Sequence, residues 1–110
     1  MQKISLTALG RTELKAALEA ASGRSAKTVY GGHEHFLRQT VIALRADEEL
    51  AEHENPGEAT VQVLQGRIIL TAGAESWSGW VGDLLIVPDA AHSLRAVENS
   101  TVLLTVVKHR

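Results

Sequence analysis

Histidine carries most of the chemistry that this sequence offers. Four of the five histidines fall in three places, as the pair His33 and His35, then His53, then His92. Imidazole binds Fe, Mn, Ni and Zn, and near neutral pH it can also act as a general acid or base. The residue types therefore predict either a metal site or a polar ligand pocket around His53 and His92.

Several other chemistries are excluded by composition and motif. The 110 residues contain no cysteine, which rules out disulfides, thiolate metal sites and a cysteine nucleophile. No phosphate-binding glycine loop and no G-x-S-x-G turn occurs, and Gly57 stands where an H-E-x-x-H motif starting at His53 needs its second histidine. The net charge of -2, from 11 basic and 13 acidic residues, predicts no nucleic-acid or membrane partner.

The stretch from residue 53 to residue 66 predicts the strand that positions the central histidine. A Pro-Gly turn follows His53, and Val61 and Val63 then alternate with Thr60 and Gln62. Gly66 ends the run as a turn residue. This pattern predicts a half-buried strand that follows a turn next to His53.

One short helix is expected before the strands. From residue 12 to residue 21, apolar residues recur at i, i+3, i+4 and i+7, and Gly23 occupies the position of a left-handed C-cap. We expect this helix to close one end of a sheet.

After Gly23 the period becomes strand-like and stays so to the end of the chain. Beside the strand that ends at Gly66, short strands are expected over residues 27–30, 37–45, 67–72, 75–81, 84–87, 92–97 and 100–107. About eight short strands without a second helix favour an all-β sandwich or barrel.

The two histidine-bearing stretches resemble the motifs of the cupin superfamily. Residues 53–66 are similar to the first motif, G-x5-H-x-H-x3,4-E-x6-G, with His53 and Gly66 in place. Residues 82–92 are similar to the second motif, G-x5-P-x-G-x2-H-x3-N, with Gly82 and Pro88 in place and His92 one residue early. We map His92 onto the ligand histidine of that motif.

The resemblance spans roughly residues 29–107 and implies a cupin-type β-jelly-roll barrel around a central cavity, commonly in a dimer. We therefore expect one cupin domain over residues 1–110, with a helical lead-in over 1–23 and a β-barrel over 24–110. A homodimer is the expected assembly.

The chain departs from both motifs at positions that carry ligands. Asn55 replaces the second histidine of the first motif and Ala59 replaces its glutamate, while Asp47 stands at the leading glycine. In the second motif, Ala90 and Ala96 replace the glycine and the asparagine. Two of the three usual ligands of the first motif are thus missing.

The carboxylate beside the missing glutamate does not restore the set. Glu58 adjoins position 59, and neighbouring residues of a strand point to opposite faces. We expect the Glu58 side chain to lie outside the barrel.

A metal site is nevertheless one hypothesis. His33 and His35 are two residues apart, which places both rings on one face if they lie in a strand. His35, His53 and His92 would then form a three-histidine site for Fe, Mn, Ni or Zn. The alternative is a solvated pair, because Gly31 and Gly32 precede it.

A metal-free pocket is the other hypothesis. His53 and His92 would face a small polar ligand, and Asn55, Gln62 and Gln39 would orient it through hydrogen bonds. A purely structural interpretation has these polar groups satisfying one another. Trp77 and Trp80 are expected to cap a sheet or form a dimer contact.

Three functions follow from these hypotheses. The first is a small-molecule-binding barrel that acts as a sensor or accessory protein, without a tight metal site. The second is a metal-dependent oxygenase or isomerase, and the third is a structural dimer module. No apolar run approaches the roughly 18 residues of a membrane span and no leader pattern is evident, so a cytoplasmic protein is expected.

Overall fold

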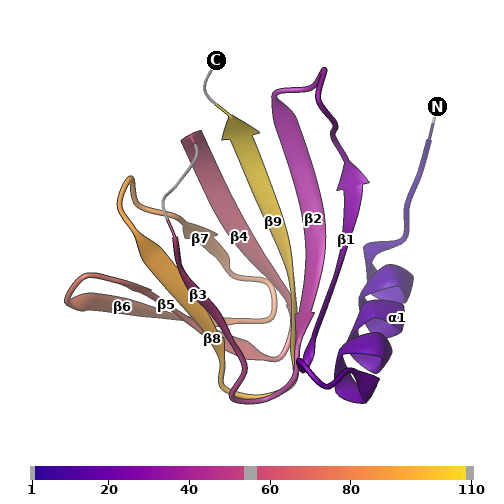
Figure 1. The fold of residues 1–110 in the computed structure, drawn as a ribbon, viewed down its shortest axis with the longest axis horizontal. Coiled ribbons are helices and arrows are strands. Elements are labelled where there is room, and N and C mark those ends of the chain that lie inside the picture. The colour runs from indigo at the N-terminus through magenta and orange to yellow at the C-terminus, as the bar shows by residue number, and fades with distance from the viewer. Residues whose placement is uncertain (1, 54–56, 109–110) are drawn as a thin grey trace.

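A computed structural model describes residues 2–53 and 57–108, with His53 described by its backbone alone. Within these residues the chain forms one helix followed by nine strands (Figure 1). Their bounds are α1 (Leu6–Glu19), β1 (Arg24–Tyr30), β2 (Leu37–Leu44), β3 (Glu49–His53), β4 (Gly57–Gln65), β5 (Arg67–Ala72), β6 (Glu75–Trp80), β7 (Leu84–Ile86), β8 (His92–Ala96) and β9 (Ser100–Lys108).

The described strands are arranged in two antiparallel sheets. One sheet has five strands in the order β1-β2-β9-β4-β7, and the other has four in the order β3-β8-β5-β6. In Figure 1 the two sheets face each other, and the C-terminal end of β9, the β1–β2 link and the start of β4 lie at the upper end. The prediction of an all-β barrel with one N-terminal helix is confirmed.

An apolar layer between the sheets holds them together. Along β4 the residues Ala59, Val61 and Val63 are buried, whereas Glu58 before them and Gln62 between the valines are exposed. The same alternation recurs in neighbouring strands, because Cα partners in an antiparallel pair project on the same face. The buried cluster contains Ile42, Leu44, Ala59, Val61, Val63, Ile68, Leu70, Val87, Leu94, Ala96, Val102 and Val106.

The helix covers the outer face of the five-stranded sheet over β1 and β2. Ala17 of the helix and Val41 and Ala43 of β2 are all fully buried, which gives this face a small apolar layer of its own. The expectation that the helix closes one end of a sheet is therefore wrong. A face with buried valine and alanine needs a cover, and an amphipathic helix provides it.

The helix also begins earlier than its apolar repeat indicated. Ser5 is the N-cap, and its side-chain oxygen accepts the N–H of Ala8 at 3.2 Å. Ala20 already has an extended backbone, so the helix ends at Glu19 rather than at residue 21. The helix begins directly after Ser5 because this serine caps one of its free backbone N–H groups, and Ser5 lies outside the apolar repeat.

Strand β3 was not foreseen. Its sequence, ELAEH, contains two glutamates and a histidine, and it lies at the edge of the four-stranded sheet beside β8. An edge strand that buries little can be mostly polar, so the hydrophobic pattern does not reveal it.

The turn at Gly66 fixes the junction between the two sheets. Gly66 has φ +81°, and a Cβ there would collide with the carbonyl of Asn99 and the hydroxyl of Ser100. That hydroxyl accepts the N–H of Arg67 at 3.1 Å and lies 2.7 Å from the carbonyl of Glu98. Only glycine provides both the backbone conformation and the space.

Replacing Gly66 with alanine should lower the free energy of unfolding by about 3 kcal/mol or more, since the left-handed conformation costs about 1–2 kcal/mol and the clash adds a similar amount. The matched control is Gly73→Ala in the β5–β6 turn, where φ is +60° but nothing lies within 4 Å of the added Cβ. That variant should lose only about 1–2 kcal/mol. Urea denaturation measures both, and equal losses would contradict the steric role of Gly66.

Candidate functional site

His92 is the buried polar side chain at one end of the barrel. It is the first residue of β8, is only 5% exposed, and shares its face with Leu94 and Ala96 of the core. Its Nδ1 lies 3.0 Å from the carbonyl oxygen of Ala90. Because a carbonyl can only accept, this hydrogen bond requires a proton on Nδ1, and Nε2 of the neutral ring is then an acceptor.

The register places His53 beside His92. His53 ends β3, and its Cα partner in β8 is His92, with a register shift between Leu50 and His53. The two histidines of the motifs are therefore neighbours in the four-stranded sheet. Asn55, the third residue expected in this pocket, lies outside the described residues.

The first motif's carboxylate position faces inward but holds only a methyl group. Ala59 is 7% exposed and belongs to the same buried cluster as Leu94. Glu58 is exposed on the other face of β4, which confirms the prediction from strand alternation. The barrel thus gains no carboxylate from this strand.

The two glutamines expected in the pocket lie on the outer face of the five-stranded sheet. Gln62 is exposed, and its inward-facing neighbours on β4 are Val61 and Val63. Gln39 of β2 donates from Nε2 to the hydroxyl of Thr105 at 3.3 Å, on the face that the helix also covers. The expectation that these side chains contact a ligand in the barrel is corrected, because strand parity turns both away from it.

The pair His33 and His35 follows the second of the two alternatives, the solvated pair after the glycines. It lies in the link between β1 and β2 rather than in a strand, and His33 is exposed. The ring of His35 packs against Tyr30, with the centroids 5.0 Å apart and the planes at 38°. His35 therefore belongs to a loop of the five-stranded sheet, whereas His92 lies in the other sheet.

The described side chains do not fit a tight divalent metal site. Among residues 2–52 and 57–108, no group of three or more His, Cys, Asp or Glu side chains is placed to hold a metal ion. A catalytic Fe, Mn, Ni or Zn site needs about three protein donors. The three-histidine cluster with His35 includes His53, whose side chain lies outside the described residues, so the cluster stays a prediction; of its other two members, His35 lies in the β1–β2 link and His92 in the four-stranded sheet.

The tryptophans lie on β6, at the edge of the four-stranded sheet. Trp80 is 53% exposed, and the guanidinium of Arg67 stacks over its ring at 4.7 Å from the centroid. Trp77 is the Cα partner of the buried Leu70 and is partly exposed. Trp80 and Arg67, which are Cα partners in β6 and β5, thus form a cation–π pair.

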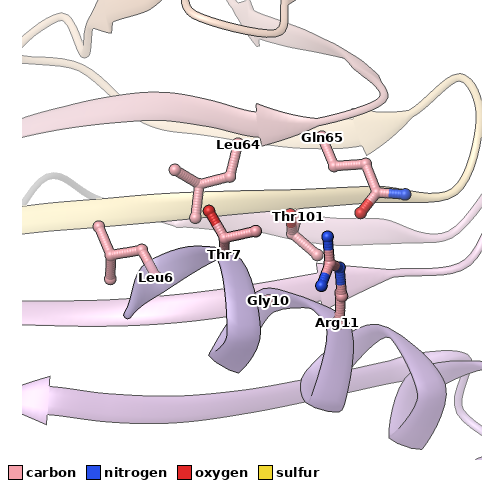
Figure 2. A pocket seen from close by; sticks show the side chains of 7 residues that line it. All are labelled: Leu6, Thr7, Gly10, Arg11, Leu64, Gln65 and Thr101. Carbon is pink, nitrogen blue, oxygen red and sulfur yellow. The ribbon is translucent and has the colours of Figure 1, made fainter. Parts of the chain in front are cut away.

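Among the hollows on the described part of the molecule, two lie beside the helix and beside the β1–β2 link, and His92 lines neither of them. One, of about 320 Å³, separates α1 from the strand ends at Leu64, Gln65 and Thr101, and Figure 2 shows Arg11 reaching across it. The other, also about 320 Å³, lies beside the β1–β2 link and contains the side chains of Arg38 and Lys108. The sequence did not predict this basic pair. The available signal was that each cation lies an even number of residues from an inward-facing apolar residue of its strand.

Comparisons with known proteins identify the fold. No family model matches the chain, and no curated protein matches it. Solved structures do match. A conserved protein of unknown function from Streptococcus pyogenes is 29% identical over 83% of this chain and 79% of its own, with a TM-score of 0.74.

Two further structures carry informative names. A cupin superfamily protein from Desulfitobacterium hafniense is 16% identical over 98% of this chain and 92% of its own, with a TM-score of 0.78. A salicylate 1,2-dioxygenase from Pseudoaminobacter salicylatoxidans is 22% identical over 94% of this chain but only 32% of its own, with a TM-score of 0.75. The chain has the cupin fold, as the motif resemblance predicted. The helix within the described residues is not long and apolar enough to cross a membrane.

Substituting glutamate for Ala59 should create metal affinity, because it returns a carboxylate to the inward-facing position of the motif. We expect Ni²⁺ or Zn²⁺ to bind at least roughly tenfold more tightly than to the unmodified protein, because the glutamate adds a third, negatively charged donor to two neutral imidazoles. Equilibrium dialysis with elemental analysis measures the change.

The matched control for this variant is Gln62→Glu, which adds the same charge on the opposite face of β4. It should leave metal affinity unchanged. Thermal denaturation checks that Ala59→Glu remains folded, since a buried carboxylate costs stability. Equal metal affinity in the two variants would contradict the inward placement of position 59.

Proposed function

We propose that this chain binds a small organic molecule in its barrel, at the end where His92 lies, and that it does so without a tight metal site. The observation that carries the proposal is the buried imidazole of His92, which lies among apolar core residues. His92 is 5% exposed beside core residues such as Leu94, and Ala59 stands where a metal-binding cupin motif has its glutamate.

Small-molecule pockets have this character. They are lined mostly by apolar side chains, and a few polar groups set the orientation of the ligand. The hydrogen bond from Nδ1 to the carbonyl of Ala90 fixes the orientation of the His92 ring among the apolar core residues. An accessory or sensor role suits a barrel that retains its fold but lacks the usual donors.

A metal-dependent enzyme is the alternative, and the donor set disfavours it. The salicylate 1,2-dioxygenase with this fold is named for catalysis, but at 22% identity the likeness supports the fold alone. No step of an oxygenase or isomerase reaction is assigned to this chain, because its described residues supply too few donors.

Elemental analysis of protein purified without chelators tests the metal-free proposal. We expect Fe, Mn, Ni and Zn together to amount to well below one equivalent per chain. The physical reason is that two imidazoles without a carboxylate hold a divalent ion only weakly. One full equivalent of any of these metals, lost in His53→Ala and His92→Ala variants that stay folded, would favour the enzyme instead.

Ligand binding is tested by NMR of the imidazole signals. A set of small carboxylic acids, sugars and amides is added, and at least one compound should shift the His92 signals saturably. Binding should be lost in His92→Ala and kept in Gln62→Ala, whose side chain lies on the outer face. A folded protein whose His92 signals respond to no compound would contradict the proposal.

We also propose that the chain forms a homodimer through the outer side of β7. Val81, Leu84 and Ile86 are 63%, 58% and 71% exposed, and β7 is an edge strand of the five-stranded sheet. Exposed apolar side chains gathered on an edge strand are typical of an interaction surface. A second copy of the chain would cover the same patch on both partners, as twofold symmetry requires.

Ile86→Lys should shift the assembly towards the monomer, because the lysine charge would be buried in the contact. Light scattering coupled to size-exclusion chromatography measures the mass. The control is Leu18→Lys, which introduces the same charge at an exposed leucine of α1. A monomeric unmodified protein, or the same effect in both variants, would reject this surface.

A further inference from the structure

We infer that the basic hollow beside the β1–β2 link is an anion-binding site that takes the carboxylate or phosphate group of the ligand. Arg38 and Lys108 supply its positive charge. This inference rests on the proposed function and gives the ligand a chemical class, a small molecule with an anionic end.

The register turns both cations towards the inner side of the five-stranded sheet. Arg38 is the Cα partner of Val106, which belongs to the buried cluster between the sheets. Lys108 lies two residues after Val106 on β9 and so shares its face. The neighbouring strands β2 and β9 therefore present these two cationic side chains on the same face of the five-stranded sheet.

These side chains line a defined hollow. Its volume is about 320 Å³, which is enough for a small organic anion, and its walls are formed by Thr28, Gly31, Gly32, His33, Arg38 and Lys108. Thr28 adds a hydroxyl, 3.4 Å from that of Thr40. The walls thus combine a guanidinium, an ammonium, an imidazole and a hydroxyl, all of which can donate hydrogen bonds to an anion.

A glycine brings the link close to the arginine. Gly31 has φ +128°, and a Cβ at that position would lie 3.1 Å from both Cα and Cβ of Arg38. A larger residue would force the link away from β2. The glycine therefore preserves both the backbone path and the shape of the hollow.

Neither cation of the hollow is held in an ion pair within the described part of the chain. Within it, the side-chain ion pairs join Arg45 to Glu48 and Arg95 to Asp47, and neither involves Arg38 or Lys108. The exposed Glu34, in the link beside Gly32, is the nearby carboxylate. Two cations facing one hollow attract an anion more strongly than one, and guanidinium binds carboxylate and phosphate through two parallel hydrogen bonds.

The hollow and His92 lie at the same end of the barrel. Lys108 is the Cα partner of Gly57, the first residue of β4. His53, four positions before Gly57, is the last described residue of β3 and the Cα partner of His92. A ligand held by its anionic end at Arg38 and Lys108 can therefore extend towards His92.

The experiment is an amide NMR titration with inorganic phosphate, with succinate and with uncharged succinamide. Phosphate, succinate or both should shift the amide signals of Gly31 and Gly32 saturably, while succinamide should not. If only phosphate gives saturable shifts, the site takes a phosphate group. If only succinate does, the site takes a carboxylate. If both do, the site recognises the negative charge that the two anions share.

Variants test the assigned residues. Arg38→Gln and Lys108→Gln should each weaken anion binding by roughly five- to tenfold, as expected for loss of a charge-assisted hydrogen bond. Arg38→Lys keeps the charge and should weaken it less. The matched control is Lys27→Gln on β1, whose Cα partner Val41 lies on the helix-covered face, and it should bind as the unmodified protein does.

The outcomes separate this inference from the proposed function. No saturable shift at Gly31 and Gly32, or equal weakening in Lys27→Gln and Arg38→Gln, would overturn the anion site. If the anion site were overturned but a neutral compound still shifted the His92 signals, the proposed binding of a small molecule in the barrel would stand without the anion site. Anion binding at the hollow in a protein whose His92 signals respond to no compound would sustain the anion site and reject the barrel ligand.

Discussion

The apolar layer between the two sheets is the constraint on which the structure depends. Each strand must turn alternate residues into this layer, and the buried cluster draws on both sheets, from Ile42 and Val61 on one side to Ile68 and Leu94 on the other. Once these residues face inward, the direction of every neighbouring side chain on the same strand follows. A polar side chain of a strand therefore points into the barrel only if it lies an even number of residues from a core residue of that strand.

That constraint explains why few polar side chains face the inside of the barrel. Position 59 is in phase with the core but holds alanine, while Glu58 is out of phase and exposed. His92 is in phase with Leu94 and Ala96, so its imidazole is buried at the end of the apolar layer. An imidazole in an apolar wall is suited to orienting a small ligand, whereas a divalent ion would need more donors.

Charge is distributed unevenly around the end of the barrel where His92 lies. Arg38 and Lys108 line a hollow beside the β1–β2 link, while Glu58 and Asp89 line a separate hollow of about 380 Å³ between β4 and β7. The two hollows are separated by the paired residues Lys108 of β9 and Gly57 of β4. An anionic group is therefore attracted to the side formed by β1, β2 and β9 and repelled from the side formed by β4 and β7.

The sequence alone determined the fold class, most strand positions, the turn at Gly66 and the outward direction of Glu58, because alternation and glycine turns are local signals. It did not determine the polar edge strand β3, the helix start set by Ser5, or the outward direction of Gln39. The tertiary structure decided these, along with the meeting of Arg38 and Lys108, since they depend on which strands pair and in which register. Contacts between residues 70 positions apart leave no trace in local periodicity.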